Sequence, residues 1–264
     1  MNSYRWDAHD YEKNSAQQRQ WAQELLQKLE LRGNETILDI GCGDGKITAE
    51  IATLLPAGSI TGIDLSEEMI ALARQRFPSL IYPNLHFQKA DAASLPFEAE
   101  FTVIFSNAAL HWISDNRPVV NGMSRSLKSG GRILLQMGGK GNAAEIVAVL
   151  DKMIQSPGWS EYFADFRFPY GFFSQSEYEV WLRQAGLKPG RVELVPKDMV
   201  HPGRAGLLGW LRTTWLPYTQ RVPESKREGF LDELADTYLI DHPLDEQGQV
   251  HVRMVRLEVE AVKV

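Results

Sequence analysis

The chain has 264 residues, of which 44% are hydrophobic, and a formal net charge of -6. This is enough apolar material for one sizeable core, while the negative charge argues against broad binding to a nucleic-acid backbone. The single cysteine, Cys42, excludes an intramolecular disulfide framework and a multi-cysteine metal site, and we expect no metal. No apolar run reaches the roughly 18 residues of a membrane span, and the polar N-terminal stretch does not resemble a signal peptide. We therefore expect a soluble, cytoplasmic protein with no nucleic-acid or membrane partner.

The first half of the chain alternates helix-like and strand-like segments. Helical spacing of Trp21, Leu25 and Leu29 predicts a helix over 14–31. The following strands are expected at 36–41, 58–65, 84–92, 101–110 and 130–138, with helices at 46–55, 67–77 and 117–127. The 101–110 segment is apolar on both faces, which is typical of a central parallel strand. Five strands alternating with helices predict β-α-β units and a parallel sheet.

The character of the sequence changes after Gly141. Residues 157–173 are rich in aromatic side chains, and Ser174 with Glu177 forms a capping box that opens a helix. Further helices are expected at 142–154, 178–186, 202–219 and 223–240, and strands at 191–200 and 249–264. Because the last segment alternates, it predicts a strand that returns to the sheet. The expected fold is α/β: a doubly wound, Rossmann-like, seven-stranded, mainly parallel sheet with a helical cap insertion.

A glycine-rich turn follows the first predicted strand in the stretch "ILDIGCGDGKI". Its third glycine comes one place earlier than in a dinucleotide fingerprint, where this chain has Lys46 instead. Glycines in such a turn let the backbone approach a ligand closely. Asp64 ends the second predicted strand, where an acid can accept both hydroxyls of a ribose. The spacing favours a nucleotide-type cofactor other than NAD or a flavin.

Four motifs together resemble the class I S-adenosylmethionine (SAM) dependent methyltransferases: "LDIGCGDG", "GIDLS", "ADAASLPF" and "FSNAALHW". The resemblance covers roughly residues 33–138. Within that superfamily, "FSNAALHWI" and the N-terminal pattern of Tyr, Gln and Trp are similar to the trans-aconitate and juvenile hormone acid methyltransferases, which methylate small carboxylic acids. The resemblance implies SAM as cofactor, S-adenosylhomocysteine (SAH) as product, and a small acceptor that is anionic or apolar-anionic.

The resemblance also implies roles for individual residues around the cofactor. Asp64 would bind the ribose hydroxyls, while Asp39 and Gly41 would approach the methionine amino group. Leu65 and Met69 would flank the adenine. The remaining expected cofactor residues are Gly43 in the turn, Asp91 and Ala92 at the adenine, Asn107 under the methionine moiety, and Tyr11 and Gln18 on the N-terminal segment.

Three residues are candidates for the acceptor side of the site. His111 could line the pocket, donate to a carboxylate or act as a base, because an ordinary imidazole titrates near neutrality. Trp112 is expected as a wall of the pocket. Arg212 could hold an acceptor carboxylate in a bidentate fork, although a solvated helix-face arginine is the plainer interpretation. The aromatic side chains of 157–173 could form a core of their own or face an apolar acceptor.

Four segments are expected along the chain. Residues 1–32 form a helical segment that closes on the cofactor, and 33–140 form the cofactor-binding core. Residues 141–245 form a mostly helical substrate cap with one core strand, and 246–264 form the terminal core strand.

The predicted activity is O-methylation of a small carboxylic acid by in-line displacement, because a carboxylate is ionised at pH 7 and needs no base. The alternatives are methylation of another carbon, nitrogen or hydroxyl centre, a SAM-binding protein without transferase activity, and an NAD-dependent oxidoreductase. The sequence identifies neither the acceptor nor the oligomeric state.

Overall fold

The computed structural model describes residues 16–264, with side chains from residue 20 onward. It divides into two compact units, which are described here one at a time. The sheet unit comprises Trp21–Lys140, Tyr170–Val195 and Arg256–Val264. The described residues of the helical unit are Gly141–Pro169 and Pro196–Val255, together with 16–20.

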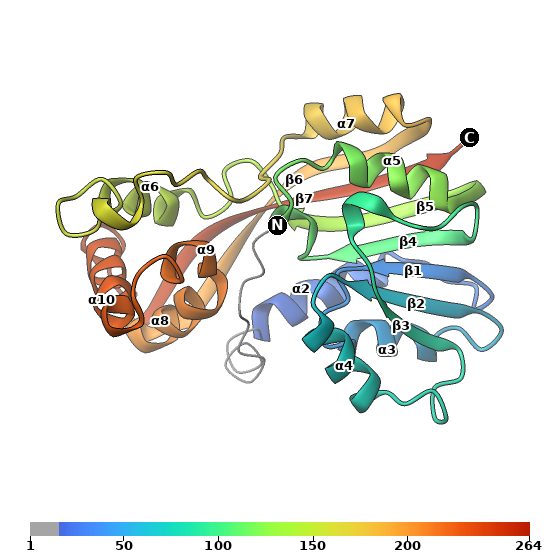
Figure 1. Cartoon of the computed structure of the whole chain (residues 1–264), viewed down its shortest axis with the longest axis horizontal. Helices are drawn as coiled ribbons and strands as arrows, with labels where there is room; N and C mark the ends of the chain where they lie inside the picture. The colour runs from blue at the N-terminus through green and yellow to red at the C-terminus, as the bar shows by residue number, and fades with distance from the viewer. Residues whose placement is uncertain (1–15) are drawn as a thin grey trace. The chain divides into compact units, whose positions relative to one another are not determined.

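Seven strands form one sheet in the order β3-β2-β1-β4-β5-β7-β6, which can be followed in Figure 1. The strands are β1 Thr36–Ile40, β2 Ser59–Asp64, β3 Leu85–Lys89, β4 Phe101–Asn107, β5 Leu127–Gly138, β6 Leu187–Pro202 and β7 Gln249–Lys263. Strands β1 to β5 are parallel, and β7 runs antiparallel to β5. The predicted doubly wound, mainly parallel seven-stranded sheet is confirmed.

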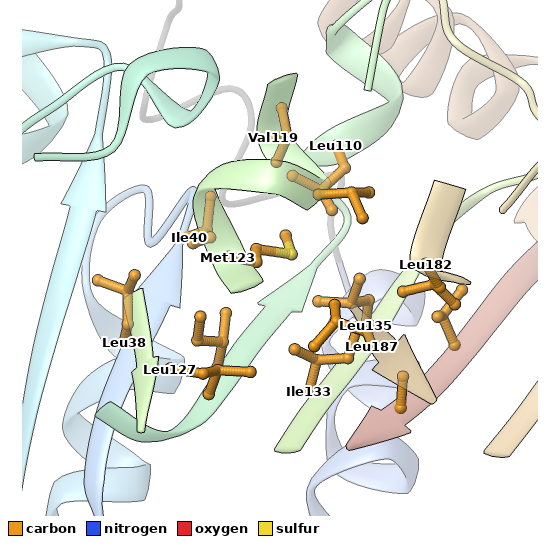
Figure 2. Packing of buried hydrophobic residues seen from close by; sticks show 14 of the residues in the cluster. Leu38, Ile40, Leu110, Val119, Met123, Leu127, Ile133, Leu135, Leu182 and Leu187 are labelled. Atoms are coloured by element: carbon orange, nitrogen blue, oxygen red, sulfur yellow. The ribbon is translucent and has the colours of Figure 1, made fainter. Parts of the chain in front are cut away.

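Helices cover both faces of the sheet. The helices of this unit are α3 Lys46–Thr53, α4 Glu67–Arg76, α5 Arg117–Ser126, α7 Gln175–Gln184 and the part of α2 Ala16–Gln27 that starts at Trp21. Successive strand residues point to opposite faces: Ile37 packs in the cluster with α2, α3 and α4, while Leu38 packs in the cluster with α5 and α7. Figure 2 shows the second cluster, in which Met123 of α5 and Leu182 of α7 meet side chains of the strands.

Local sequence explains where several helices begin. Ser66 caps α4 by accepting a hydrogen bond from the Met69 N–H at 3.2 Å, and Glu67 and Glu68 lie in the first turn, where negative charge is favourable. The predicted capping box at α7 is present, with Ser174 and Glu177 bonded reciprocally.

Two predicted elements end earlier than the sequence pattern suggests. The strand expected over 101–110 stops at Asn107, because Ala108 adopts a left-handed backbone with φ 55°. The helix expected over 202–219 is two helices, α8 Gly203–Thr214 and α9 Leu216–Thr219. Pro217 lies in the first turn of α9 and has no N–H for a continuous helix.

The helical unit is built on α6 Ala144–Met153, α8, α9 and α10 Glu224–Asp241. Aromatic residues of the 157–173 segment pack with these helices: Phe163 stacks on Phe230 at 5.9 Å between ring centroids, and Phe166 contacts Tyr218 at 4.5 Å. These residues therefore supply the core of this unit. From residue 16 to the C-terminus, the structure holds no helix that is both long and apolar enough to cross a membrane.

Helix α7 packs on the sheet through Tyr178 and Leu182, although its residues were expected in the substrate cap. Residues 141–245 are therefore divided between the two units, and α7 belongs to the sheet unit.

Candidate cofactor and acceptor site

The carboxyl ends of β1, β2 and β4 meet at one edge of the sheet, because these strands are parallel neighbours. The topological switch point of the sheet lies between β1 and β4, where the strand order reverses. Open α/β sheets bind their ligands at this point. The buried Ser106 hydroxyl donates to the Ile40 carbonyl at 2.7 Å and joins the two strand ends. The candidate site is built at this edge.

The turn after β1 is shaped by glycines that other residues could not replace without strain. Gly41 has φ 77° and donates its N–H to the Ile63 carbonyl at 2.8 Å. A Cβ at Gly41 would come within 2.1 Å of the Ala109 Cβ, so the turns after β1 and β4 are in close contact. At Gly43, by contrast, a Cβ would meet no atom within 4 Å among the described residues. The backbone at Gly43 therefore borders open space.

Asp64 ties this turn to the end of β2. Its Oδ2 accepts a hydrogen bond from the Gly43 N–H at 3.0 Å, and its Oδ1 accepts one from the Ser66 N–H at 2.9 Å. Burial raises the pKa of Asp64, and these N–H groups oppose that shift. Each oxygen keeps a lone pair for a further donor, as binding of a ligand diol requires. Leu65 beside it is 46% exposed, while Met69 is part-buried in the first turn of α4.

Asp39 is a second acid at the same edge and is almost fully buried, with 3% of its surface exposed. Its Oδ2 accepts a hydrogen bond from the Thr48 hydroxyl at 2.6 Å. Burial raises the pKa of Asp39 to about 7; the Thr48 bond lowers it, and the nearby charge of Asp64 adds to the rise. Two acids in a poorly solvated place favour a ligand that carries positive charge.

Asp91 and Ala92 follow β3, next to Asp64. The Ala90 N–H donates to the Asp64 carbonyl at 3.1 Å, which holds the two strand ends together. Asp91 Oδ1 accepts from the Ala93 N–H at 2.8 Å and caps a short 3-10 helix, Ala92–Ser94. The structure thus places Asp91 and Ala92 directly after the strand end that is bonded to Asp64, while their contact with the adenine stays a prediction.

The end of β4 supplies an amide. The side-chain Oδ1 of Asn107 is buried and has no hydrogen-bond partner among the described residues. A buried carbonyl oxygen without a donor is costly, so this atom suits a ligand that brings an N–H group.

His111 and Trp112 lie in the 3-10 helix Leu110–Trp112 that follows β4. His111 is buried, and its Nδ1 accepts a long hydrogen bond of 3.4 Å from the Gly138 N–H. Burial, and secondarily the charge of Arg256, lower the pKa of His111 to about 3, so the ring is neutral. The Trp112 ring lies 5.1 Å from Tyr170, which stacks on Phe172 at 5.3 Å. These rings form one aromatic group with His111.

The other predicted residues are placed differently. Arg212 lies in α8 of the helical unit, where its Nε is 3.5 Å from Glu228 Oε1 and its side chain is 42% exposed. Tyr11 lies outside the described residues, and Gln18 is described only as a backbone position of α2. The roles of these three residues stay predictions.

Two residues at this edge did not emerge from the sequence: Thr48, which holds Asp39, and Arg256, whose charge reaches His111. Thr48 is the third residue of α3. The sequence could have indicated it as a hydroxyl residue in the first turn of the helix that follows the glycine turn. The sequence could have indicated Arg256 as a charged residue within a strand that was expected to return to the sheet.

The edge as a whole fits a ligand with a diol and a cationic group. Asp64 can accept from hydroxyls, buried Asp39 favours a cation, and Gly43 leaves room for close approach. SAM carries a ribose diol, an ammonium group and a sulfonium, so the residues present fit this cofactor.

A Rossmann-like sheet with a glycine turn at its switch point and an acid ending the second strand defines a nucleotide-cofactor-binding protein. Residues 31–186 match a family model described as a methyltransferase domain. A trans-aconitate 2-methyltransferase of Shigella dysenteriae is 30% identical over 97% of both chains. An uncharacterised methyltransferase of Schizosaccharomyces pombe is 33% identical over 73% of this chain and 74% of its own.

A solved structure shares the fold at 18% sequence identity: the geranyl diphosphate C-methyltransferase of Streptomyces coelicolor, in complex with SAH. The TM-score is 0.56, with 93% of this chain and 80% of that chain covered. The chain belongs to the methyltransferase family, and it is a SAM-dependent methyltransferase. The predicted enzyme class and cofactor are confirmed.

Proposed function

We propose that this enzyme O-methylates a small-molecule carboxylic acid. The observation that carries the proposal is the burial of His111, the imidazole that follows β4, whose Nδ1 already accepts a hydrogen bond from the Gly138 N–H at 3.4 Å. An alcohol or phenol acceptor needs a partner that takes its proton, and a pKa of about 3 makes His111 a poor base. A carboxylate is already ionised above about pH 5, so it needs no base to take a proton. The likeness to trans-aconitate 2-methyltransferases over nearly the whole chain supports the same acceptor class.

The proposed cofactor contacts are made by polar groups at the carboxyl edge of the sheet. Asp64 would accept the ribose hydroxyls, and Asp39 would face the ammonium group. Asn107 Oδ1 would accept from that same ammonium group, while Asp91 and Ala92 would meet the adenine. When bound, SAM supplies a methyl group already activated by a positively charged sulfur.

The protein's own task is then alignment and exclusion of water. In-line transfer requires the acceptor oxygen, the methyl carbon and the sulfur to lie on one line, so the gain comes from positioning. The aromatic group of Trp112, Tyr170 and Phe172 is proposed as the wall that keeps the acceptor in place. The ring of His111, which burial keeps neutral, contacts all three of these rings and would shape the wall without exchanging a proton.

The proposal is tested with matched acceptors. We expect methyl transfer to small organic acids, trans-aconitate among them, and at least 100-fold slower transfer to the primary amide or alcohol of the same carbon skeleton. The comparison measures SAH formation at a fixed SAM concentration. Equal or faster transfer to the alcohol, or to a carbon or nitrogen centre, would contradict acid O-methylation.

The pH dependence separates Asp39 from His111. Below about pH 7, Asp39 binds a proton and loses its attraction for the ammonium group. We therefore expect kcat/KM for SAM to fall by up to about tenfold per pH unit below 7, while kcat at saturating substrates stays flat between about pH 5 and 8. Initial rates across this range check both quantities.

The control is Asp39→Asn, which should weaken SAM binding at pH 8 and remove its pH dependence. A kcat that falls with a midpoint near pH 6.5 would show a titrating imidazole and contradict the role given to His111.

A further inference from the structure

A buried amide spans the loop that carries His111 and Trp112. The side chain of Asn116 is 0% exposed, and its Nδ2 donates hydrogen bonds to the carbonyls of Leu110 at 3.1 Å and Ile113 at 2.9 Å. These carbonyls belong to the residue just before His111 and the residue just after Trp112. The amide therefore joins the two ends of the short 3-10 helix that carries both rings.

Asn116 is the N-cap residue of α5, where an asparagine side chain ordinarily accepts a hydrogen bond from the first N–H groups of the helix. Among the described residues, its side chain makes no such cap bond. Its Oδ1 instead accepts from the hydroxyl of Tyr178, a fully buried residue of α7. Burial raises the pKa of Tyr178, so the hydroxyl keeps its proton and stays a donor. The amide thus serves the loop and α7 in place of its own helix.

The segment that precedes α7 lies on the same loop. The Gly171 N–H donates to the His111 carbonyl at 2.8 Å. A Cβ at Gly171 would come within 2.3 Å of the Ile113 carbonyl oxygen, so the two backbones are in direct contact. Gly171 lies between Tyr170 and Phe172, so this contact holds together the two segments that supply the aromatic group.

The place of this loop matters because of what it borders. Ala109 comes immediately before the 3-10 helix, and it is the residue that a Cβ at Gly41 of the glycine turn would meet. A shift of the loop would therefore move the aromatic wall relative to the cofactor edge. In-line transfer is sensitive to such shifts, since a displacement of about 1 Å can cost roughly 100-fold in rate.

Resting on the proposed function, we propose that Asn116 and Tyr178 are positioning residues that hold Trp112 where its ring aligns the acceptor with the methyl group of SAM. Neither residue needs to touch a ligand, because the amide and the hydroxyl fix the loop and the ring on the loop orients the acceptor. Loss of either contact would lower kcat and leave SAH binding nearly unchanged, because the glycine turn and Asp64 are untouched.

The first test removes single contacts of this chain of hydrogen bonds. Tyr178→Phe deletes one oxygen atom and keeps the packed ring. With trans-aconitate as acceptor, we expect kcat to fall about tenfold to 100-fold, while the Kd for SAH stays within about twofold of wild type. Asn116→Ala also frees the two loop carbonyls and should lose more. The stoichiometry of SAH binding gives the folded fraction, by which each kcat is corrected.

The matched control is Ser124→Ala. The buried Ser124 hydroxyl of α5 donates to the Ala185 carbonyl at the end of α7 at 2.6 Å, so this change breaks a hydrogen bond between the same two helices. It should lower stability to a similar extent and leave kcat within about twofold of wild type. A loss of kcat as large as that of Tyr178→Phe would show general loosening and overturn the proposal.

A double variant tests whether Tyr178 acts through the ring on the loop. In a Trp112→Ala background, Tyr178→Phe should lower kcat by less than about threefold, because the ring that it positions is gone. The same tenfold to 100-fold loss with and without Trp112 would overturn the proposal, as would a wild-type kcat in folded Tyr178→Phe.

Backbone amide exchange over residues 109–115 needs no acceptor and separates this proposal from the proposed function. Tyr178→Phe should speed exchange there at least about fivefold, and Ser124→Ala should not. Faster exchange in an enzyme that methylates no acid would overturn acid methylation and support the hold on the loop. Unchanged exchange, with wild-type transfer to acids, would overturn the positioning role alone.

Discussion

Asp64→Ala is expected to weaken SAH binding about tenfold to 150-fold, since hydrogen bonds to a charged group contribute about 1.5–3 kcal/mol. The change removes the acceptor proposed for the ribose hydroxyls. It also frees the Gly43 and Ser66 N–H groups, which Asp64 holds at 3.0 and 2.9 Å, so the glycine turn is no longer tied to β2. Isothermal titration with SAH measures the loss.

The matched control is Glu67→Ala. Glu67 is an acid three positions along the chain with 63% of its side chain exposed, and its removal should leave SAH affinity unchanged. A folded Asp64→Ala protein with wild-type affinity would show that the cofactor does not bind at the end of β2.

Gly41→Ala is expected to damage both stability and cofactor binding, because the added methyl group has no space. A left-handed backbone costs a non-glycine residue roughly 1–2 kcal/mol, and overpacking typically adds 1–3 kcal/mol. The new Cβ would lie 2.1 Å from the Ala109 Cβ, so the turns after β1 and β4 must move apart. We expect a loss of about 2–5 kcal/mol in the free energy of unfolding, measured with urea, and a clear loss of SAH affinity.

Two variants separate the causes of this loss. Gly130→Ala has a similar φ of 73° with no described atom within 4 Å of the new Cβ, so it should show the backbone cost alone. Adding Ala109→Gly to Gly41→Ala removes the clash and should return the loss to the level of Gly130→Ala. If Gly41→Ala is no worse than Gly130→Ala, the two turns are not packed as described.

The parts of the fold that depend on local patterns could be predicted from the sequence. The apolar run of β4, the capping box at α7 and the glycine turn each have a signature within ten residues. The ends of elements were harder, because the left-handed backbone of Ala108 that stops β4 is not indicated by its residue type. Asp39 and Asp64 could be placed because the ends of parallel strands meet at one edge.

The residues that the sequence did not single out depend on contacts across the sheet. Arg256 reaches the edge only through the register of β7 against β5, and the pairing of residues more than 100 positions apart leaves no local pattern. Arg212 was selected because an arginine can hold a carboxylate in a fork and because its helix was expected to cover the site. In the structure its Nε lies 3.5 Å from Glu228 Oε1, and its role toward an acceptor stays a prediction.

The central claim is that the methyl group ends on a carboxylate oxygen, and the fate of a labelled methyl group tests it most directly. The enzyme is incubated with methyl-labelled SAM and trans-aconitate, and the labelled product is then treated with mild base. A methyl ester is hydrolysed under these conditions, so the account predicts that the label is released as volatile methanol. A label that stays on the product after base treatment would place the methyl group on carbon, nitrogen or an ether oxygen and would contradict the account.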